Sequence, residues 1–382
     1  MALIGEVGIA QLLHHGEELC GDTVEIIRAE DNTVVVLSDG LGSGVKANIL
    51  SSLTAKIASR MIAEDIAIED IVETLVSTLP TCSERGIAYS TFSILRLYNT
   101  GAVFMVDFDG CPMIRISKDK KVSVIETMPS IIGEKKINEA SFKMEAGDTI
   151  IIVSDGVIQA GLGELLPFGL GTDGLVDSLE RFIDLDDNVQ SIAWKIVNIC
   201  KSYYLGEPGD DTTAVVMRLK EEQRLVIMTG PPVKMSDDAK IVKRFIEEEG
   251  KKIICGGTTA QIYARETGKQ ILSNFHYAKQ NVPPISYIDG VDLVTEGIIT
   301  LSAVKERLDA QEPLTEGEED GASLLLREIL ESDHILFLQG MQENIAMKDN
   351  LPLHIDLRDV IVEKLAAKLR SIGKIVDIEQ YN

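Results

Sequence analysis

The chain of 382 residues is poor in basic residues, in cysteine and in long apolar runs. It has 37 Lys and Arg against 61 Asp and Glu, which gives a net charge of −24. A chain with this excess of negative charge repels phosphate backbones and anionic lipid. The composition therefore argues against nucleic-acid and membrane-surface partners. No apolar run approaches the roughly 20 residues that span a bilayer. Residues 1–6 also lack the basic-then-apolar pattern of a secretory signal.

The cysteines are few, odd in number and far apart, and no two form a Cys-x-x-Cys pair. This spacing argues against a disulfide framework and against a zinc-cysteine site, and it predicts a protein of the reducing cytoplasm. The five are Cys20, Cys82, Cys111, Cys200 and Cys255.

The length and composition are those of a globular protein with two or three domains. Hydrophobic residues make up 45% and charged residues 26%. The charged segment Lys220–Arg224 separates two regions that differ in the order of their expected strands and helices. We therefore expect one domain over residues 1–220 and a second over residues 224–382.

The first domain alternates buried strands with hairpins and a few helices. Short β-branched or apolar runs predict strands, and turns such as Asn99-Thr100-Gly101 predict antiparallel hairpins. Helical spacing of apolar residues predicts four helices. We place the single tryptophan, Trp194, in the core. The strands are expected at 33–38, 89–98, 102–108, 113–117, 122–127, 149–154 and 213–219, and the first two helices at 43–63 and 68–79.

The second domain alternates strands with helices throughout, which predicts an α/β layer with a mostly parallel sheet. Gly230 and Gly256 follow strands and precede helices, a place where α/β domains can hold a small anionic ligand. Helix starts capped by Ser236 and Thr258 are the simpler interpretation. The strands are expected at 224–229, 251–255, 334–339 and 374–378, and the helices at 237–249, 258–266, 301–308, 324–330 and 359–372. An acidic loop is expected at 311–320.

One short phrase occurs twice in the first domain. Val34-Val-Val-Leu-Ser-Asp39-Gly40 and Ile150-Ile-Ile-Val-Ser-Asp155-Gly156 both place an aspartate and a glycine at the carboxyl end of a buried strand. Either phrase alone is most simply a turn. Two copies, together with Gly209-Asp210-Asp211-Thr212-Thr213 and with Asp22 before another strand, indicate a site.

Carboxylates gathered at a sheet edge repel one another unless a cation neutralises them. Oxygen-only ligands favour a hard divalent ion, Mg²⁺ or Mn²⁺, over zinc. Glycine after each aspartate lets the backbone bend so that its carbonyl can also approach the ion. The residues therefore predict a site for Mn²⁺ or Mg²⁺.

Residues 5–219 resemble a protein phosphatase 2C (PPM) domain of the SpoIIE type. The resemblance is carried by motifs in the same order and at similar spacing. They are Val7-Gly-Ile-Ala-Gln11, Cys20-Gly-Asp22, Asp39-Gly-Leu-Gly-Ser-Gly-Val-Lys-Ala47, Tyr89-Ser-Thr-Phe92, Asp109-Gly-Cys-Pro112, Ser154-Asp-Gly156 and Asp210-Asp-Thr-Thr213. Residues 224–382 resemble no family that we recognise.

The resemblance implies an α+β fold, an α-β-β-α sandwich, followed here by the smaller α/β domain. It also implies two Mn²⁺ or Mg²⁺ ions per site, with Asp39, Asp155 and Asp210 as the catalytic residues. By the same resemblance the metal ligands are Asp22, Asp39, Gly40 (through its carbonyl), Asp155, Asp210 and Asp211, with Asp22 as an outer acid and Asp211 ordering metal-bound water.

The implied activity is hydrolysis of phosphoserine or phosphothreonine on a phosphorylated regulatory protein, by a water that the two ions activate. No covalent nucleophile is required. The chain departs from the eukaryotic pattern at Leu41, where a histidine is frequent, and Arg28 is not in the context of the phosphate-clamping arginine. In relatives of the SpoIIE type the helices that correspond to 43–63 and 68–79 act as a switch.

Two alternatives stay open. The chain could be a catalytically weak or inactive sensor or scaffold that acts through its second domain, or a nucleotide-binding enzyme based on that domain. The residue types of the last helix suit either a core or the face of a homodimer. The pair His14-His15 is interpreted as a solvated turn rather than as metal ligands.

Overall fold

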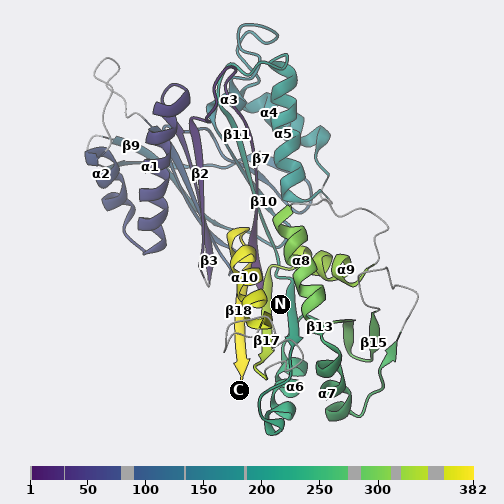
Figure 1. Ribbon diagram of the computed structural model, residues 1–382. Helices are drawn as coiled ribbons and strands as arrows, with labels where there is room; N and C mark the ends of the chain where they lie inside the picture. Colours follow the sequence, from purple (N-terminus) through teal and green to yellow (C-terminus); the bar gives the residue numbers. More distant parts are fainter. Residues whose placement is uncertain are drawn as a thin grey trace. The chain divides into compact units, whose positions relative to one another are not determined.

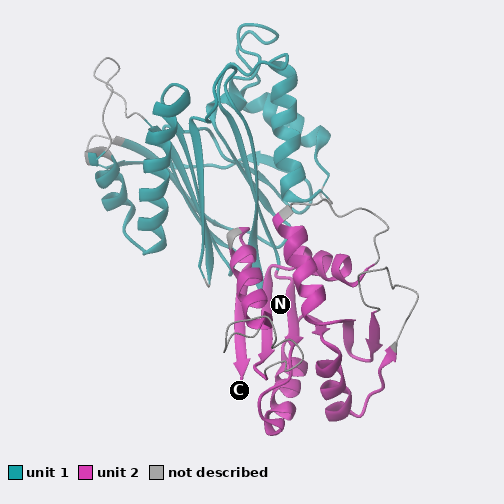
Figure 2. Cartoon of the chain, viewed as in Figure 1, with its two compact units in different colours: residues 1–221 teal, residues 222–382 magenta. Residues whose placement is uncertain are grey.

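The computed structural model describes residues 2–29, 31–78, 90–132, 135–184, 187–273, 285–310, 320–342 and 357–382. The chain divides into two compact units, Met1–Glu221 and Glu222–Asn382 (Figure 2). Cys82, the start of the strand expected at 89–98, and the acidic loop expected at 311–320, except Asp320 itself, lie outside the described residues. Within the described part, no helix is both long enough and apolar enough to cross a membrane.

Unit 1 contains two antiparallel sheets (Figure 1). One has the strand order β1-β11-β10-β6-β7, and the other has the order β2-β3-β4-β5-β9-β8. The strands are β1 (Leu3–Leu12), β2 (Asp22–Arg28), β3 (Asn32–Gly40), β4 (Ser90–Tyr98), β5 (Ala102–Phe108), β6 (Ile114–Ile116), β7 (Val122–Val124), β8 (Met128–Ile132), β9 (Lys135–Lys143), β10 (Thr149–Val153) and β11 (Thr212–Glu221).

Side chains of a strand point alternately to the two faces of its sheet. One face of each sheet packs against the other sheet, and the opposite, outer face is covered by helices. Val35 and Leu95 point into the core between the sheets, where they meet Ile150 and Val215 of the other sheet. The helices α1 (Gly44–Ala63) and α2 (Ile68–Thr78) pack on the sheet that contains β3. On the sheet that contains β10 pack α3 (Asp155–Ile158), α4 (Gly171–Phe182) and α5 (Val189–Tyr203). The predicted α-β-β-α sandwich is confirmed.

The expectation for Trp194 is wrong, because its side chain is 48% exposed. The buried positions of α5 are Val189, Ile192, Ala193, Ile196, Val197 and Cys200. These form one stripe at helical spacing, and position 194 falls outside it. The helical phase therefore outweighs the general tendency of tryptophan to be buried.

Unit 2 is built around a seven-stranded sheet with the order β14-β15-β16-β13-β12-β17-β18. Its five strands from β16 to β18 are parallel, and β14 and β15 form an antiparallel edge. The strands are β12 (Arg224–Thr229), β13 (Lys251–Cys255), β14 (Leu272–Ser273), β15 (Ser286–Ile288), β16 (Val291–Thr295), β17 (His334–Gly340) and β18 (Ile375–Tyr381). The predicted layered domain with a mostly parallel sheet is confirmed.

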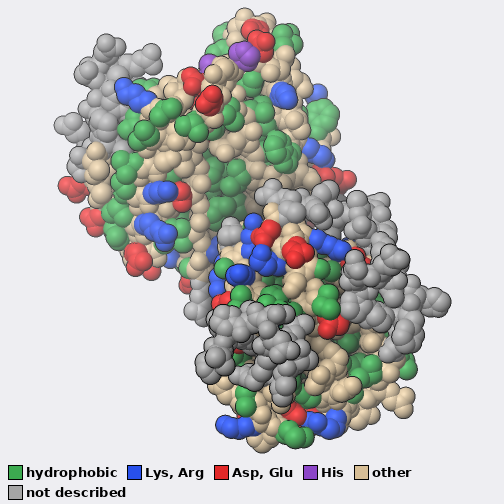
Figure 3. Space-filling view, in the orientation of Figure 1, with side chains coloured by type: hydrophobic (Ala, Val, Ile, Leu, Met, Phe, Trp, Pro, Cys, Tyr) green, Lys and Arg blue, Asp and Glu red, His purple; other side chains and the backbone are tan. Residues whose placement is uncertain are grey.

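Helices lie on both faces of this sheet. The helices α6 (Asp238–Glu247) and α7 (Gly257–Thr267) pack on one face. The other face is covered by α8 (Ile298–Ala310), α9 (Gly321–Glu331) and α10 (Leu357–Ser371). The two expected caps are wrong: α7 has Gly256 at its N-cap position, and a short 3₁₀ helix, Met235–Asp237, precedes α6. On the face of the molecule in Figure 3, basic and acidic side chains are interspersed.

The Asp320 carboxylate, just before α9, forms a bidentate ion pair with Arg307 of α8. It accepts hydrogen bonds from Nη1 and Nη2 of Arg307, at 3.0 and 2.8 Å, and caps α9 by accepting one from the backbone N–H of Ser323 at 2.8 Å. The hydrogen bond from Arg307 is the main reason that the pKa of Asp320 is lowered to about 2. This stabilisation is therefore present above the ordinary carboxyl pKa and is lost as the pH falls from about 4 towards 2.

We expect Asp320→Ala to lower the free energy of unfolding by about 3–5 kcal/mol at neutral pH, because it removes the carboxylate that pairs with the partly buried Arg307 guanidinium and also caps α9. Urea unfolding measures this change. The matched control is Glu247→Ala. Glu247 pairs with Lys243, and because these side chains are 61% and 73% exposed the loss should stay below about 1 kcal/mol. Equal losses in the two variants would contradict the prediction.

Candidate active site

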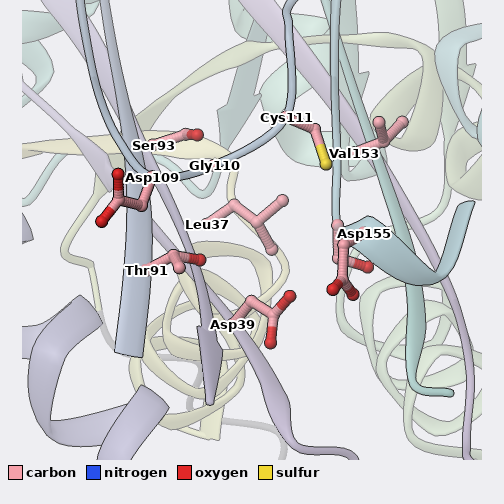
Figure 4. A pocket seen from close by; sticks show the side chains of 10 residues that line it. Leu37, Asp39, Thr91, Ser93, Asp109, Gly110, Cys111, Val153 and Asp155 are labelled. Carbon is pink, nitrogen blue, oxygen red and sulfur yellow. The ribbon is translucent and has the colours of Figure 1, made fainter. Parts of the chain in front are cut away.

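The two Asp-Gly phrases lie on opposite sheets and meet at one pocket. Asp39 is near the end of β3, and Asp155 is the first residue of α3, separated from the end of β10 by Ser154. Figure 4 shows their carboxyl groups pointing towards each other. The pocket has a volume of about 180 Å³. Its lining consists of Leu37, Asp39, Thr91, Ser93, Asp109, Gly110, Cys111, Val153, Ser154 and Asp155.

Each glycine of the repeated phrase allows a close approach of backbone. A Cβ at position 40 would lie 2.3 Å from the carbonyl oxygen of Ala47 in α1. A Cβ at position 156 would lie 2.2 Å from the carbonyl oxygen of Asp211. The Gly156 carbonyl accepts a hydrogen bond from Tyr204 Oη at 2.7 Å. The glycines thus bring α1 and the start of β11 against the two aspartates.

Asp22 lies beside Asp39, because the two residues are paired in register between β2 and β3. The Asp22 side chain is buried, and its Oδ2 accepts a hydrogen bond from Thr213 Oγ1 at 2.6 Å. Gln11 Nε2 in turn donates to Thr213 Oγ1 at 3.1 Å. Burial is the main cause that raises the pKa of Asp22, to about 7. Asp22 is therefore held by residues of β1 and β11.

Asp210 and Asp211 are neighbours in sequence but differ in surroundings. Asp210 is half-buried, and its pKa is raised to about 6, mainly by burial and then by the charge of Asp155. Asp211 is buried, and both of its oxygens are bonded to main chain. Oδ1 accepts from the N–H of His14 at 3.0 Å, and Oδ2 accepts from the N–H of Gly21 at 2.8 Å. Asp211 thus fastens the β1–β2 loop.

The carboxyl groups repel one another at this edge. The pKa of Asp39 is raised to about 9, first by burial and then by the charges of Asp22, Asp155 and Asp210. Within the described residues, no three His, Cys, Asp or Glu side chains surround one point closely enough to hold a metal ion as they stand. A cation would have to draw the carboxylates together. Oxygen-only donors with mutual repulsion fit a hard divalent ion, which would relieve that repulsion.

Other polar residues support the aspartates. Gln159 Nε2 donates to Asp155 Oδ2 at 2.7 Å, four residues along the chain, a spacing at which helical side chains meet. Ser90 Oγ donates to the carbonyl oxygen of Asp39 at 2.9 Å. Gln159 was not identified from the sequence, although its spacing of four residues from Asp155 was a usable signal. Thr213 was identified only as part of the motif Asp210–Thr213, without its hydrogen bond to Asp22. Arg28, which the sequence did not match to the phosphate-clamping arginine, donates a hydrogen bond to the carbonyl oxygen of Gly5 at 2.8 Å.

The family model described as Stage II sporulation protein E (SpoIIE) matches residues 29–220, about half of the chain. No curated protein matches the chain. The matched region includes Asp39, Asp155, Asp210 and Asp211, and it begins after Asp22.

Several solved structures resemble unit 1. A structure of the PP2C phosphatase domain and a fragment of the regulatory domain of SpoIIE from Bacillus subtilis is 21% identical, with a TM-score of 0.50, over 57% of this chain and 64% of that chain. The phosphatase domain of the same protein in a crystal form without domain swapping is 21% identical, with a TM-score of 0.46, over 57% and 93%. RsbX in complex with magnesium is 20% identical, with a TM-score of 0.41, over 57% and 96%. The chain spans less than two thirds of the first structure, and at these identities the likeness shows the fold alone.

Proposed function

Since the chain belongs to the SpoIIE family, in which one solved structure contains a PP2C phosphatase domain, we propose that it is a metal-dependent protein phosphatase acting on phosphoserine and phosphothreonine of a regulatory protein. The observation that carries this proposal is the meeting of Asp39 and Asp155, from opposite sheets, at one pocket with Asp22 and Asp210 nearby. Carboxylates from different strands that meet at one pocket repel one another, and bound cations would offset this repulsion.

In this proposal Asp39, Asp155 and Asp210 hold two Mn²⁺ or Mg²⁺ ions together with the carbonyl of Gly40, and Asp22 acts as an outer acid. When bound, such a pair supplies a water nucleophile at neutral pH and offsets the charge on the phosphoryl oxygens. Asp211 positions the β1–β2 loop through its two backbone hydrogen bonds. Its role as a metal ligand, which the resemblance implies, would require at least one of these bonds to be shared.

Cys111 lines the pocket but does not suit nucleophilic attack. Burial, and then the charges of Asp155 and Asp39, raise the pKa of its thiol, so the thiolate is disfavoured. A covalent cysteine intermediate is therefore a poor alternative. This agrees with a mechanism in which water attacks phosphorus directly.

Hydrolysis of p-nitrophenyl phosphate and of a phosphoserine peptide tests the proposal. We expect turnover with Mn²⁺, none after treatment with EDTA, and recovery when Mn²⁺ is added back. The alternative, an inactive scaffold, has in its favour that the carboxylates do not surround a common point as they stand. Negligible Mn²⁺ binding in calorimetry would favour the scaffold, and turnover that persists in EDTA would refute the metal assignment.

We propose that unit 2 is a regulatory domain that binds a ligand or a partner. Its parallel strands reverse their winding direction between β12 and β17, a place where α/β sheets hold ligands at the carboxyl ends of the strands. Thr229 and Gln339 are the paired residues there, and each has a buried side-chain oxygen without a hydrogen-bond partner. Thermal shift of the full chain against a nucleotide panel tests whether that ligand is a nucleotide.

A further inference from the structure

The helix α1 begins beside the acidic site. Ala47, in its first turn, approaches Gly40 so closely that a Cβ at position 40 would lie 2.3 Å from the Ala47 carbonyl oxygen. The residues of α1 that pack on the sheet of β3 include Ala55 and Ala58. The opposite face of the helix is turned towards solvent. A molecule that lies along this outer face would therefore have one end next to Asp39.

Three large apolar side chains are exposed on the outer face of α1. Val45, Ile49 and Leu53 have 61%, 60% and 43% of their surface exposed. Successive members of this apolar row are four residues apart, the spacing at which helical side chains lie on one face. Exposed apolar residues that are scattered singly are ordinary, but a row of them marks a surface that another molecule covers.

The same face continues into basic side chains. Lys56 and Arg60 follow Leu53 by three and seven residues, which keeps them on the face of the apolar row. Both are exposed, and neither forms an ion pair within the part of the chain that the structure describes. The helix carries no Asp or Glu, although acidic residues outnumber basic ones by 61 to 37 in the chain. Basic and hydrophobic side chains are visible over α1 in Figure 3.

The charges on and around α1 distinguish between the molecules that could cover it. A second copy of the chain, paired through α1, would place basic residues against basic residues, which is unfavourable. A membrane of anionic lipid would also meet α2, which packs against α1 and exposes Glu69, Asp70 and Glu73. A protein segment is narrow enough to contact α1 alone, and acidic residues on it would pair with Lys56 and Arg60. The complementary occupant is therefore an acidic protein segment that also carries apolar side chains.

We propose that the exposed face of α1 is a docking surface for the phosphorylated protein substrate, whose acidic and apolar residues lie along the helix while its phosphorylated residue reaches the pocket. This inference rests on the proposed function, because the occupant is the substrate of the same site. From Val45 to Arg60 the face is about 22 Å long, at 1.5 Å per helical residue, which suits a helix of about four turns. The pocket, which is lined by Asp39, Asp109 and Asp155, repels a phosphoryl group without cations, so docking on α1 supplies affinity that the pocket lacks.

Fluorescence anisotropy with two synthetic phosphoserine peptides tests this docking in EDTA, where Mn²⁺-dependent turnover does not interfere. One peptide carries a helix with a row of Leu flanked by Glu, and the other has Gln in place of each Glu. We expect the full-length wild type to bind the Glu peptide about tenfold more tightly than the Gln peptide, and this preference should shrink as salt is added. The double variant Lys56→Glu and Arg60→Glu should lose the preference. Ile49→Ser should weaken the binding of both peptides about tenfold, because an apolar contact is lost.

The matched control is the double variant Lys121→Glu and Lys201→Glu, which changes the net charge by the same amount at exposed lysines outside α1. It should keep the wild-type preference, and loss of the preference in both double variants would show that only net charge matters and would overturn the inference. The double variant Lys56→Gln and Arg60→Gln, which should reduce the preference less, takes the place of the glutamate variant if that does not fold.

Equal affinity of the wild type for the two peptides would overturn the inference, as would an unchanged preference after the substitutions at Lys56 and Arg60. Cosedimentation with phosphatidylglycerol vesicles that these substitutions abolish would overturn it in favour of a membrane, and a dimer in light scattering that Ile49→Ser dissociates would do so in favour of a second copy. If the wild type binds the Glu peptide through α1 but hydrolyses neither peptide with Mn²⁺, the proposed function fails and α1 remains the site of an acidic protein segment. If it hydrolyses both peptides with equal kcat/KM and shows no preference in binding, the docking surface fails and the proposed function stands.

Discussion

Replacing Asp39 with asparagine should abolish Mn²⁺-dependent hydrolysis of p-nitrophenyl phosphate and, without metal, raise the melting temperature of the protein. Both effects have one cause. Asp39 is partly buried among carboxylates, and this burial, followed by the charges of Asp22, Asp155 and Asp210, raises its pKa from the ordinary 3.8 to about 9. Asparagine lacks the negative charge that would bind a cation. It also removes the repulsion between Asp39 and the neighbouring carboxylates, which destabilises the protein when no metal is bound.

The effect on stability depends on pH in a defined direction. A carboxyl group with a raised pKa stabilises the fold fully below its unfolded pKa, near 4, and this contribution is lost as the pH rises towards 9. Metal-free wild type should therefore lose stability between about pH 4 and 9, and Asp39→Asn should lose less. A difference of 1 kcal/mol corresponds to a shift of about 2–4 °C for a domain of the size of unit 1.

Thermal unfolding in EDTA and in Mn²⁺ measures the melting temperature of the metal-free and of the metal-bound protein. Mn²⁺ should raise the melting temperature of the wild type, because it binds the folded state, but should not raise that of Asp39→Asn. The matched control is Asp109→Asn. Asp109 lines the same pocket but is exposed, and its φ of 53° is a conformation that asparagine tolerates. Mn²⁺-dependent turnover by Asp39→Asn at the wild-type rate would contradict the assignment of Asp39.

Replacing Asp211 with alanine should destabilise the protein by about 2–4 kcal/mol even in EDTA. The substitution leaves the N–H groups of His14 and Gly21 without their acceptor, and hydrogen bonds to a charged group contribute about 1.5–3 kcal/mol each. Activity should fall at the same time, because the β1–β2 loop, which leads into Asp22 at the start of β2, loses its attachment.

Urea unfolding in EDTA distinguishes this role from that of a metal ligand. A residue that acts only through the metal would affect stability in Mn²⁺ and not in EDTA. Asp210→Ala is the matched control: the pKa of Asp210 is raised, so its removal should leave the metal-free protein as stable as the wild type or more so. Full stability of Asp211→Ala in EDTA would show that the two backbone hydrogen bonds contribute nothing.

The sequence predicted the elements whose side chains follow a simple pattern. The uniform apolar runs before Asp39 and Asp155 identified β3 and β10, and the bounds of β5, β12 and β13 agree with those expected. By contrast β9, with the sequence Lys-Lys-Ile-Asn-Glu-Ala-Ser-Phe-Lys, mixes charged and polar residues and was not recognised. It is an interior strand between β5 and β8, and its pairing with them, rather than its own pattern, makes it a strand.

The site was only partly accessible to sequence reasoning, for a similar reason. A repeated Asp-Gly phrase indicates two strand ends but does not say that they come from opposite sheets, which is a property of the tertiary fold. Asp210 and Asp211 are identical in type, so nothing in the sequence separates a side chain at the rim from one bonded to the loop of His14 and Gly21. That distinction comes from the direction of each side chain at the start of β11.

Crystallography of the full chain with Mn²⁺, with anomalous data collected at the manganese edge, is the most direct test of a two-ion site. We expect two peaks about 4 Å apart, contacted by the carboxylates of Asp39, Asp155 and Asp210. A map of Mn²⁺-soaked crystals with no peak between β3 and α3, or with manganese only at other surface carboxylates, would contradict it.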